Sequence, residues 1–310
     1  MKLSQEKLYG LCTRCENPKS YYDWCPPCDN LKLINEFSSW TSGNVIVNEI
    51  IRNTQKHATS YTSYLEWIPW EKLVNVKKFK LTTYCGMLEA EWIEGERITN
   101  YFRDEEIDSK RERSAPIPVF IEGDTNLTYN FSEFITECKK LYDCVKHGNR
   151  FLRFYGITQD PESSRFRIVT QFTNDGSLED YLQKNFKTLT WQKKVDILYY
   201  IVNDIANIHK SGISHRNIHI RIRNKYSDIF NFGLIMFQLA TGTIPYLTPN
   251  FPDANISIPI SYDKVMRACL NNEPTKRPDL KKLQKIFNSW RQNPSYNLVN
   301  QFELSDKLDW

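Results

Sequence analysis

The feature that most constrains the fold of this chain is a set of four cysteines within its first thirty residues. Cys12, Cys15, Cys25 and Cys28 form two pairs in the arrangement Cys-x2-Cys-x9-Cys-x2-Cys. A segment of this size cannot bury a hydrophobic core, whereas four thiolates can surround one tetrahedral zinc ion whose binding supplies folding free energy. We therefore predict a structural zinc knuckle over residues 1–30. A redox pair and a chance spacing are the alternatives, and no strand–helix context supports a redox pair.

The rest of the composition is that of a globular chain. The 310 residues are 40% hydrophobic, which is enough for one large core or two ordinary ones. The net charge is +4 and basic runs lie beside acidic ones, so the charge pattern does not indicate nucleic acid as a partner. No apolar run reaches the roughly 18 residues of a membrane span, and no apolar segment of a signal peptide follows Met1. We expect a cytoplasmic chain with reduced thiols and no membrane contact.

The hydrophobic pattern divides the chain into regions of different type. In residues 31–66, the segment "NVIVNEIIRNTQ" places Val47, Ile50 and Ile51 at helical spacing, which predicts a helical linker. Residues 72–123 have a strand-like pattern that a charged loop at 94–114 interrupts. One helical segment follows at 131–145, and a strand pair surrounds "FYGITQDPESSRFRIVTQF".

The second half of the chain is predominantly helical. Apolar residues recur at helical spacing over residues 191–208, 227–241 and 279–290. Gly242 ends the second of these segments and Pro278 precedes the third, as is typical of helix boundaries. The order is a knuckle, a linker, a strand-rich lobe with one helix and a helical lobe, which predicts an α+β fold.

From about residue 67 to 290, four segments in the correct order resemble a protein kinase of the tyrosine-kinase-like group. "RIVTQFTNDGSLEDYL" resembles the hinge strand and the helix after it, and "LTWQKKVDILYYIVNDIANIHKSGISHRNIH" resembles the long helix that leads into the His-Arg-Asp loop. "YSDIFNFGLIMFQLATGTIPY" resembles the helix that anchors this loop, and "CLNNEPTKRP" resembles the Cys-Trp-x6-Arg-Pro signature. The resemblance puts the gatekeeper at Thr170 and the hinge at Gln171, Phe172 and Thr173.

The N-terminal part resembles a large fungal kinase-like family. Its members begin with a double Cys pair and contain Trp-Thr-Ser-Gly-Asn and Leu-Glu-Trp-Ile-Pro, which stand here at 40–44 and 65–69. The resemblance implies a bilobal protein-kinase-like fold over 67–292, preceded by the zinc knuckle. The N-lobe would cover about 67–173 and the truncated C-lobe about 174–292, with a C-terminal tail at 293–310.

The phosphate-binding parts depart from the family pattern. The strand "PVFIE" best matches Val-Ala-x-Lys, so Glu122 stands in place of the lysine that contacts ATP. Glu137 lies fifteen residues later, at the place of the glutamate that holds this lysine, with Glu133 as the alternative. Two facing carboxylates repel, so we expect them to turn apart into solvent; if buried, one would be protonated. Either arrangement repels a triphosphate.

The glycine-rich loop and the catalytic loop are altered too. Lys80, Thr82 and Cys85 stand where glycines would let the backbone approach the phosphates. The catalytic triplet is His215-Arg216-Asn217, and asparagine cannot accept the substrate proton as aspartate does. Ile222 replaces the magnesium-binding asparagine.

The segment after the catalytic loop is too short for an activation segment. The family pattern separates the catalytic aspartate from the aspartate of the anchoring helix by roughly fifty residues. Here Asp228 follows only eleven positions after Asn217, which leaves no room for the Asp-Phe-Gly and Ala-Pro-Glu motifs. We expect Asp228 to remain a structural anchor, and Arg277 to lose its acidic partner at a cost in stability.

These departures predict a pseudokinase. We expect a signalling scaffold or regulatory binding module that binds zinc at Cys12, Cys15, Cys25 and Cys28 but not ATP and magnesium. Its partners would be other proteins, including active kinases or their substrates. One alternative is an active protein kinase whose gene model is incomplete at the eleven-residue gap. The other is a zinc-knuckle adaptor that binds protein or nucleic acid, with the kinase remnant as its scaffold.

Overall fold

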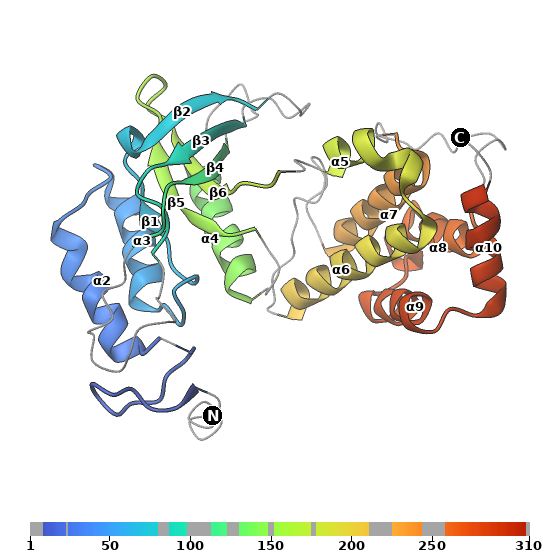
Figure 1. Cartoon of the computed structure of the whole chain (residues 1–310), viewed down its shortest axis with the longest axis horizontal. Coiled ribbons are helices and arrows are strands. Elements are labelled where there is room, and N and C mark those ends of the chain that lie inside the picture. The colour runs from blue at the N-terminus through green and yellow to red at the C-terminus, as the bar shows by residue number, and fades with distance from the viewer. Residues whose placement is uncertain are drawn as a thin grey trace. The chain divides into compact units, whose positions relative to one another are not determined.

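The chain contains two compact units (Figure 1). The computed structural model describes residues 9–22, 24–79, 87–97, 113–122, 130–147, 152–174, 178–210, 225–243 and 258–307. The first unit consists of Met1–Lys146 and Leu152–Asn174, and the second of His147–Phe151 and Asp175–Trp310. The described strands lie in the first unit, whereas the described part of the second is helical. This segregation is the predicted α+β organisation.

The first unit is built on a six-stranded sheet with the order β1-β5-β6-β4-β3-β2. The strands are β1 (Glu66–Trp67), β2 (Leu73–Lys78), β3 (Leu88–Trp92), β4 (Ile117–Glu122), β5 (Phe154–Gln159) and β6 (Phe166–Gln171). Strands β2 to β6 pair antiparallel with one another. The short strand β1, formed by the "EW" of "YLEWIPW", instead pairs parallel with β5 at the edge of the sheet.

Two hydrophobic clusters cover the two faces of this sheet because successive strand residues point to opposite sides. One cluster includes Trp92, Val119, Ile121 and Val169. The other joins residues of β5 and β6 to two helices, α3 (Val45–Lys56) and α4 (Phe131–His147). Figure 1 shows α3 beside β1 and α4 beside the sheet.

Helix α3 begins at a capping asparagine and buries one side. The Asn44 Oδ1 accepts hydrogen bonds from the backbone N–H groups of Ile46 and Val47, at 3.0 and 3.2 Å. Val47, Ile50 and Ile51, whose spacing predicted a helix, are all buried. The predicted linker therefore contributes to the hydrophobic core of the sheet-bearing unit.

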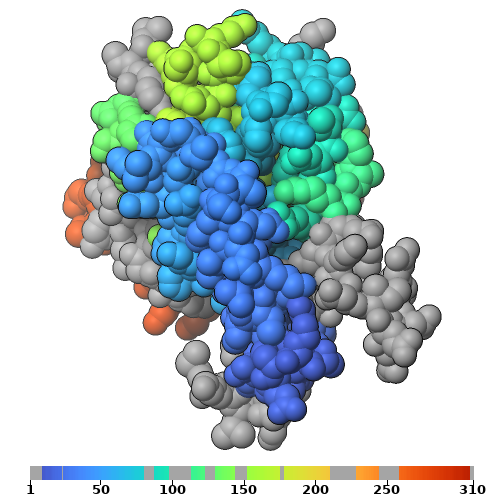
Figure 2. All heavy atoms as spheres, turned by 90° about the vertical axis from the view of Figure 1, so that its left-hand side faces the viewer, coloured from blue at the N-terminus to red at the C-terminus, as the bar shows by residue number. Residues whose placement is uncertain are grey.

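The cysteine-containing segment packs against the far end of the same linker. Trp24, with 0% of its surface exposed, contacts Leu33, Ala58 and Tyr64 in a separate small cluster. Leu33 lies in helix α2 (Leu31–Asn35), and single-turn helices flank it at Pro26–Asn30 and Glu36–Ser38. In Figure 2, the blue surface of these N-terminal residues is continuous with that of the strands.

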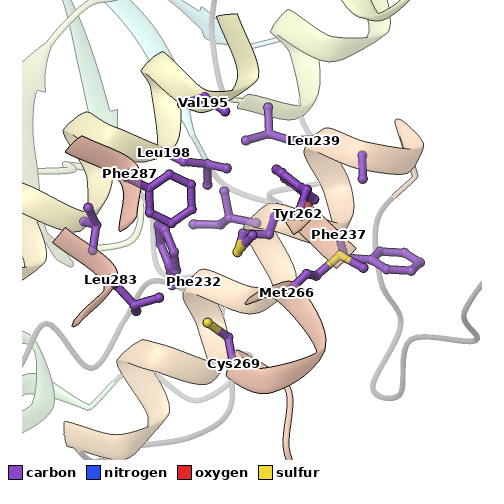
Figure 3. Packing of buried hydrophobic residues seen from close by; sticks show 14 of the residues in the cluster. Val195, Leu198, Phe232, Phe237, Leu239, Tyr262, Met266, Cys269, Leu283 and Phe287 are labelled. Carbon is purple, nitrogen blue, oxygen red and sulfur yellow. The ribbon is translucent and has the colours of Figure 1, made fainter. Parts of the chain in front are cut away.

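The second unit is a helical bundle around helix α7. Its described helices are α5 (Leu178–Asn185), α6 (Trp191–Lys210), α7 (Lys225–Thr241), α8 (Ile260–Cys269), α9 (Leu280–Gln292) and α10 (Tyr296–Lys307). Phe232 of α7 and Phe287 of α9 meet edge to face at 5.4 Å in the core that Figure 3 shows. The Tyr262 hydroxyl donates to the backbone carbonyl of Met236 at 2.7 Å, which satisfies the one polar atom of a buried ring.

The predicted C-terminal tail contains the helix α10. Leu298 and Phe302 are buried in the core of the bundle, and the Asp306 Oδ1 accepts a hydrogen bond from the backbone N–H of Trp191 at 3.0 Å. Because this N–H belongs to the first turn of α6, Asp306 caps one helix from the end of another. Among the described residues, no helix combines the length and the apolar character needed to span a membrane.

Candidate functional site

The four predicted metal ligands converge on one point. Their sulfur atoms all lie within 4.8 Å of one another, with Cys12 to Cys28 at 4.0 Å and Cys15 to Cys25 at 3.4 Å. Tetrahedral zinc with Zn–S bonds of about 2.3 Å separates its sulfur ligands by roughly 3.8 Å. The cluster therefore fits a metal ion and is compatible with zinc.

The backbone around each cysteine pair forms a tight turn. After Cys15, Glu16 adopts a positive φ of 55°, and the Glu16 N–H bonds back to the Cys12 carbonyl at 2.9 Å. The Asn17 side-chain amide donates to the Cys15 sulfur at 3.4 Å, which lowers the pKa of this thiol to about 6. This lowering favours the Cys15 thiolate that a metal ion binds, whereas burial raises the pKa of Cys25.

Asp29 connects the two turns. Its Oδ2 accepts a hydrogen bond from the Cys25 N–H at 2.6 Å, and its Oδ1 lies 3.4 Å from the Arg14 Nη2 between the first two cysteines. The Asp29 side chain is buried, so this pair fixes one turn against the other. Such outer contacts orient the ligands of a metal centre.

Glu122 and Glu137, which the sequence aligned with a lysine–glutamate pair, lie close enough for their charges to interact. Glu122 ends β4 and is half-buried, whereas Glu137 of α4 is exposed. Burial, with the nearby Glu137 charge as the second cause, raises the pKa of Glu122 to about 7. Only Glu137 turns into solvent as expected, because the pleat of β4 directs Glu122 toward the covered face. Glu137, rather than the alternative Glu133, is the carboxylate whose charge acts on Glu122.

Thr170, the predicted gatekeeper, contacts Glu122 directly. The Thr170 Oγ1 donates a hydrogen bond to the Glu122 Oε1 at 3.3 Å, and the Thr170 side chain is buried in β6. The sequence identified both residues but not the bond between them, because β4 and β6 pair across 48 positions of the chain.

Three phenylalanine rings pack together, and one of them belongs to the predicted hinge residue Phe172. Phe120 lies 4.7 Å from Phe172 and 4.8 Å from Phe79, as measured between ring centroids. Phe172 and Thr173 are half-buried, whereas Gln171 is exposed. The strand pattern Val-Ala-x-Lys would have a small alanine where this chain has Phe120.

In the helical unit, Asp228 holds two helices together. The His209 Nε2 of α6 lies 2.8 Å from the Asp228 Oδ2 of α7, and the Asp228 side chain is fully buried. The sequence predicted Asp228 as the anchor of the catalytic loop, which lies outside the described residues, and gave no sign of the contact with His209. Asn217 and Ile222, together with Lys80, Thr82 and Cys85, lie outside the described residues.

The Arg277 side chain contacts a backbone carbonyl and an aromatic ring. Its Nε donates to the Asn271 carbonyl at 2.8 Å, and its guanidinium lies 4.9 Å from the centroid of the Phe230 ring. Burial lowers the pKa of this guanidinium, while the nearby Cys269 opposes the effect. The hydrogen bond and the cation–π contact stabilise the charge for which the sequence predicted no partner.

Comparisons with known proteins show similarity to protein kinases. A family model described as protein tyrosine and serine/threonine kinase matches residues 106–224. A probable serine/threonine-protein kinase of Dictyostelium discoideum is 22% identical over 238 residues, which cover 57% of this chain and 14% of the relative. A probable LIM domain-containing serine/threonine-protein kinase of the same organism is 20% identical over 224 residues, or 54% of this chain and 34% of the relative.

A shorter match is to a probable receptor-like protein kinase of Arabidopsis thaliana, 28% identical over 131 residues, or 36% of this chain and 26% of the relative. The chain thus spans about a third or less of the length of these relatives. The strand-rich sheet and the helical unit are consistent with the α+β fold of a kinase domain. The matches support a protein kinase-like family for this chain.

Proposed function

We propose that this chain is a pseudokinase of the tyrosine-kinase-like group, which binds other proteins and does not transfer phosphate. The observation that carries the proposal is the acidic pair at the phosphate site. A kinase needs a lysine on the ATP phosphates and a glutamate that holds this lysine. In this chain Glu122 aligns with the lysine, and the neighbouring Glu137 charge contributes to its raised pKa.

The electrostatics of this pair disfavour a nucleotide triphosphate. Above pH 7 the Glu122 carboxylate is charged, and at lower pH it becomes neutral but still supplies no positive charge. The attraction between a lysine and a phosphate near the protein surface amounts to a few kcal/mol. A carboxylate in the same place repels the phosphate instead. ATP would therefore lose its main cationic contact and meet repulsion.

Packing beside the hinge supports the same proposal. The Phe120, Phe79 and Phe172 rings contact one another where the family pattern places the small alanine and the hinge. A base that stacks there would have to displace aromatic contacts worth about 0.5–1.5 kcal/mol per pair.

The catalytic loop adds a chemical argument. Asn217 aligns with the catalytic base and cannot accept a proton, and Ile222 aligns with a magnesium ligand. Asp228 retains its contact between α6 and α7 while the segment before it is too short for an activation segment. This combination supports a chain that keeps the helical framework of a kinase domain but lacks the residues for phosphate transfer.

The proposed partners are other proteins, including active kinases or their substrates, in the cytoplasm. Zinc at the four cysteines would be structural, because four sulfur ligands complete a tetrahedral site and leave no open position for a substrate.

Thermal unfolding of the full chain with and without ATP and magnesium tests the proposal. We expect an unchanged midpoint, whereas ligand at a hundredfold excess over its dissociation constant would stabilise by about 2.7 kcal/mol. The variant Glu122→Lys restores a cation opposite Glu137 and should move the response toward binding. Glu133→Lys makes the same charge change on the exposed side of α4 and serves as the matched control.

The names of the relatives favour one competing function, an active serine/threonine kinase with an incomplete gene model. Transfer of radiolabelled phosphate from ATP by the wild-type chain, lost on substitution of its own residues, would replace our proposal with that one. Sequencing the transcript between Asn217 and Asp228 decides independently whether a segment is missing.

A further inference from the structure

The structure reveals a continuous set of contacts between the cysteine cluster and helix α4 within the sheet-bearing unit. The contacts pass through residues 56–65, which run from the last residue of α3 to the residue before β1. This connection is independent of nucleotide binding and goes beyond the proposed function.

At the cysteine end, two side chains tie the cluster to this segment. Trp24, which directly precedes Cys25, donates from its indole N–H to the Ala58 carbonyl at 3.1 Å. Asn30, two residues after Cys28, donates from its amide to the carbonyls of Ala58 at 3.1 Å and Lys56 at 2.9 Å. Both side chains are buried, so the second cysteine pair cannot move without breaking buried hydrogen bonds.

The middle of the segment forms a compact turn. The Ser63 Oγ accepts hydrogen bonds from the N–H groups of Thr59 and Ser60, at 2.8 and 2.9 Å, and donates to the Ser60 carbonyl at 3.0 Å. The Ser20 hydroxyl from the cysteine segment donates to the Thr59 carbonyl at 2.7 Å. These hydrogen bonds fix the conformation of the turn and connect it to the cysteine segment.

At its other end, the segment contacts α4. The Tyr142 hydroxyl donates to the Ser63 carbonyl at 3.0 Å, across 79 positions of the chain. Leu65, with 1% of its surface exposed, shares a hydrophobic cluster with Ile135 and Cys138 of α4. Tyr64 lies 5.6 Å from Trp24, so the same turn contacts both ends of the route.

We propose that a metal ion at Cys12, Cys15, Cys25 and Cys28 stabilises helix α4 through residues 56–65. The cysteine turns have little core of their own, so metal binding supplies their folding free energy. When the metal leaves, Trp24 and Asn30 lose their fixed positions, and the turn that supports Tyr142 loosens.

Hydrogen exchange of the full chain, measured with zinc bound and after chelation, tests the coupling. Zinc content is measured in parallel, and we expect one equivalent. Loss of zinc should speed exchange at least about tenfold in residues 57–65 and 131–143, as local unfolding becomes easier. Exchange in α6 and α9, which belong to the other compact unit, should change less than about twofold.

Two conservative variants interrupt the route at its two ends. Tyr142→Phe removes the hydroxyl that donates to Ser63, and Trp24→Phe removes the indole donor to Ala58. Each should retain zinc and reduce the metal-dependent change at 131–143 by about fivefold, the worth of one buried hydrogen bond. Tyr155→Phe, whose ring lies in the cluster on the opposite face of the sheet, is the matched control.

Four outcomes would overturn the proposal. The chain could bind no zinc, or α4 could keep its protection after zinc is removed. Exchange could accelerate equally in both units, which would indicate general destabilisation. Both variants could respond to chelation as the wild type does, which would exclude the route through residues 56–65. None of these outcomes bears on ATP binding, so the proposed function is tested separately.

Discussion

Glu122 is an ionisable side chain in surroundings that disfavour its charged form. Its position at the end of β4 directs the carboxylate toward α4, where burial and the Glu137 charge both oppose ionisation. The hydrogen bond from Thr170 acts in the opposite direction and favours the charged form. Because burial is the largest of the three effects, the pKa is raised to about 7.

The raised pKa of Glu122 makes stability depend on pH. Between pH 4.5 and 7 the folded chain binds this proton while the unfolded chain releases it, so the free energy of unfolding falls as pH rises. Ionisation of Glu122 lowers the free energy of unfolding by about 3 kcal/mol in total, and this loss is complete above pH 7. We expect Glu122→Gln to be more stable than wild type by roughly 1–3 kcal/mol at pH 8, with little difference at pH 5.

Urea unfolding at several pH values measures this difference. Glu133→Gln removes an exposed carboxylate from helix α4 and should shift stability by less than about 0.5 kcal/mol at each pH. Parallel pH curves for Glu122→Gln and wild type would contradict the assignment of the pH dependence to Glu122.

Among the elements, strand β1 depends on one glycine. A Cβ at Gly156 would lie 2.0 Å from the backbone oxygen of Glu66, its partner in β1. Gly156→Ala should therefore push β1 away from β5, at the 1–3 kcal/mol typical of overpacking. We expect faster hydrogen exchange at Ile68, whose N–H donates to the Ile157 carbonyl at 2.9 Å. Pairing between β2 and β3, which Gly156 does not touch, should keep its protection.

Helix α10 is the other element whose role can be tested by a single change. Phe302 stacks against Trp191 at 6.4 Å between centroids and has 4% of its surface exposed. Phe302→Ala should lower the free energy of unfolding by about 3–5 kcal/mol, through lost burial and a new cavity. Tryptophan fluorescence during urea unfolding reports the change. Leu304→Ala, two positions away and 63% exposed, should cost less than about 0.5 kcal/mol.

At the scale of the whole molecule, the comparisons agree with the coarse prediction from sequence. The kinase-like family and the α+β arrangement of a sheet-bearing and a helical unit are supported, and the four cysteines meet as predicted. The tyrosine-kinase-like group, the loss of catalysis, the protein partners and the cytoplasmic location stay predictions. Asn217 and Ile222, on which part of the catalytic argument rests, are outside the described residues.

The sequence by itself determined what depends on local order along the chain. Helical spacing identified α3 through Val47, Ile50 and Ile51, and the Cys-x2-Cys pairs identified four cysteines that could hold a metal ion, because each signal lies within a few residues. Glu122 and Asp228 could be selected from the sequence because each lies within a short motif that aligns with the family pattern.

Only the tertiary structure decided which distant segments meet. The parallel pairing of β1 with β5, the Asp306 cap on α6, the His209–Asp228 contact and the Tyr142–Ser63 bond each join residues far apart in sequence. A two-residue strand and a single cap carry too little periodic signal to be predicted. Their free energy comes from burial and hydrogen bonds that exist only once both partners are folded.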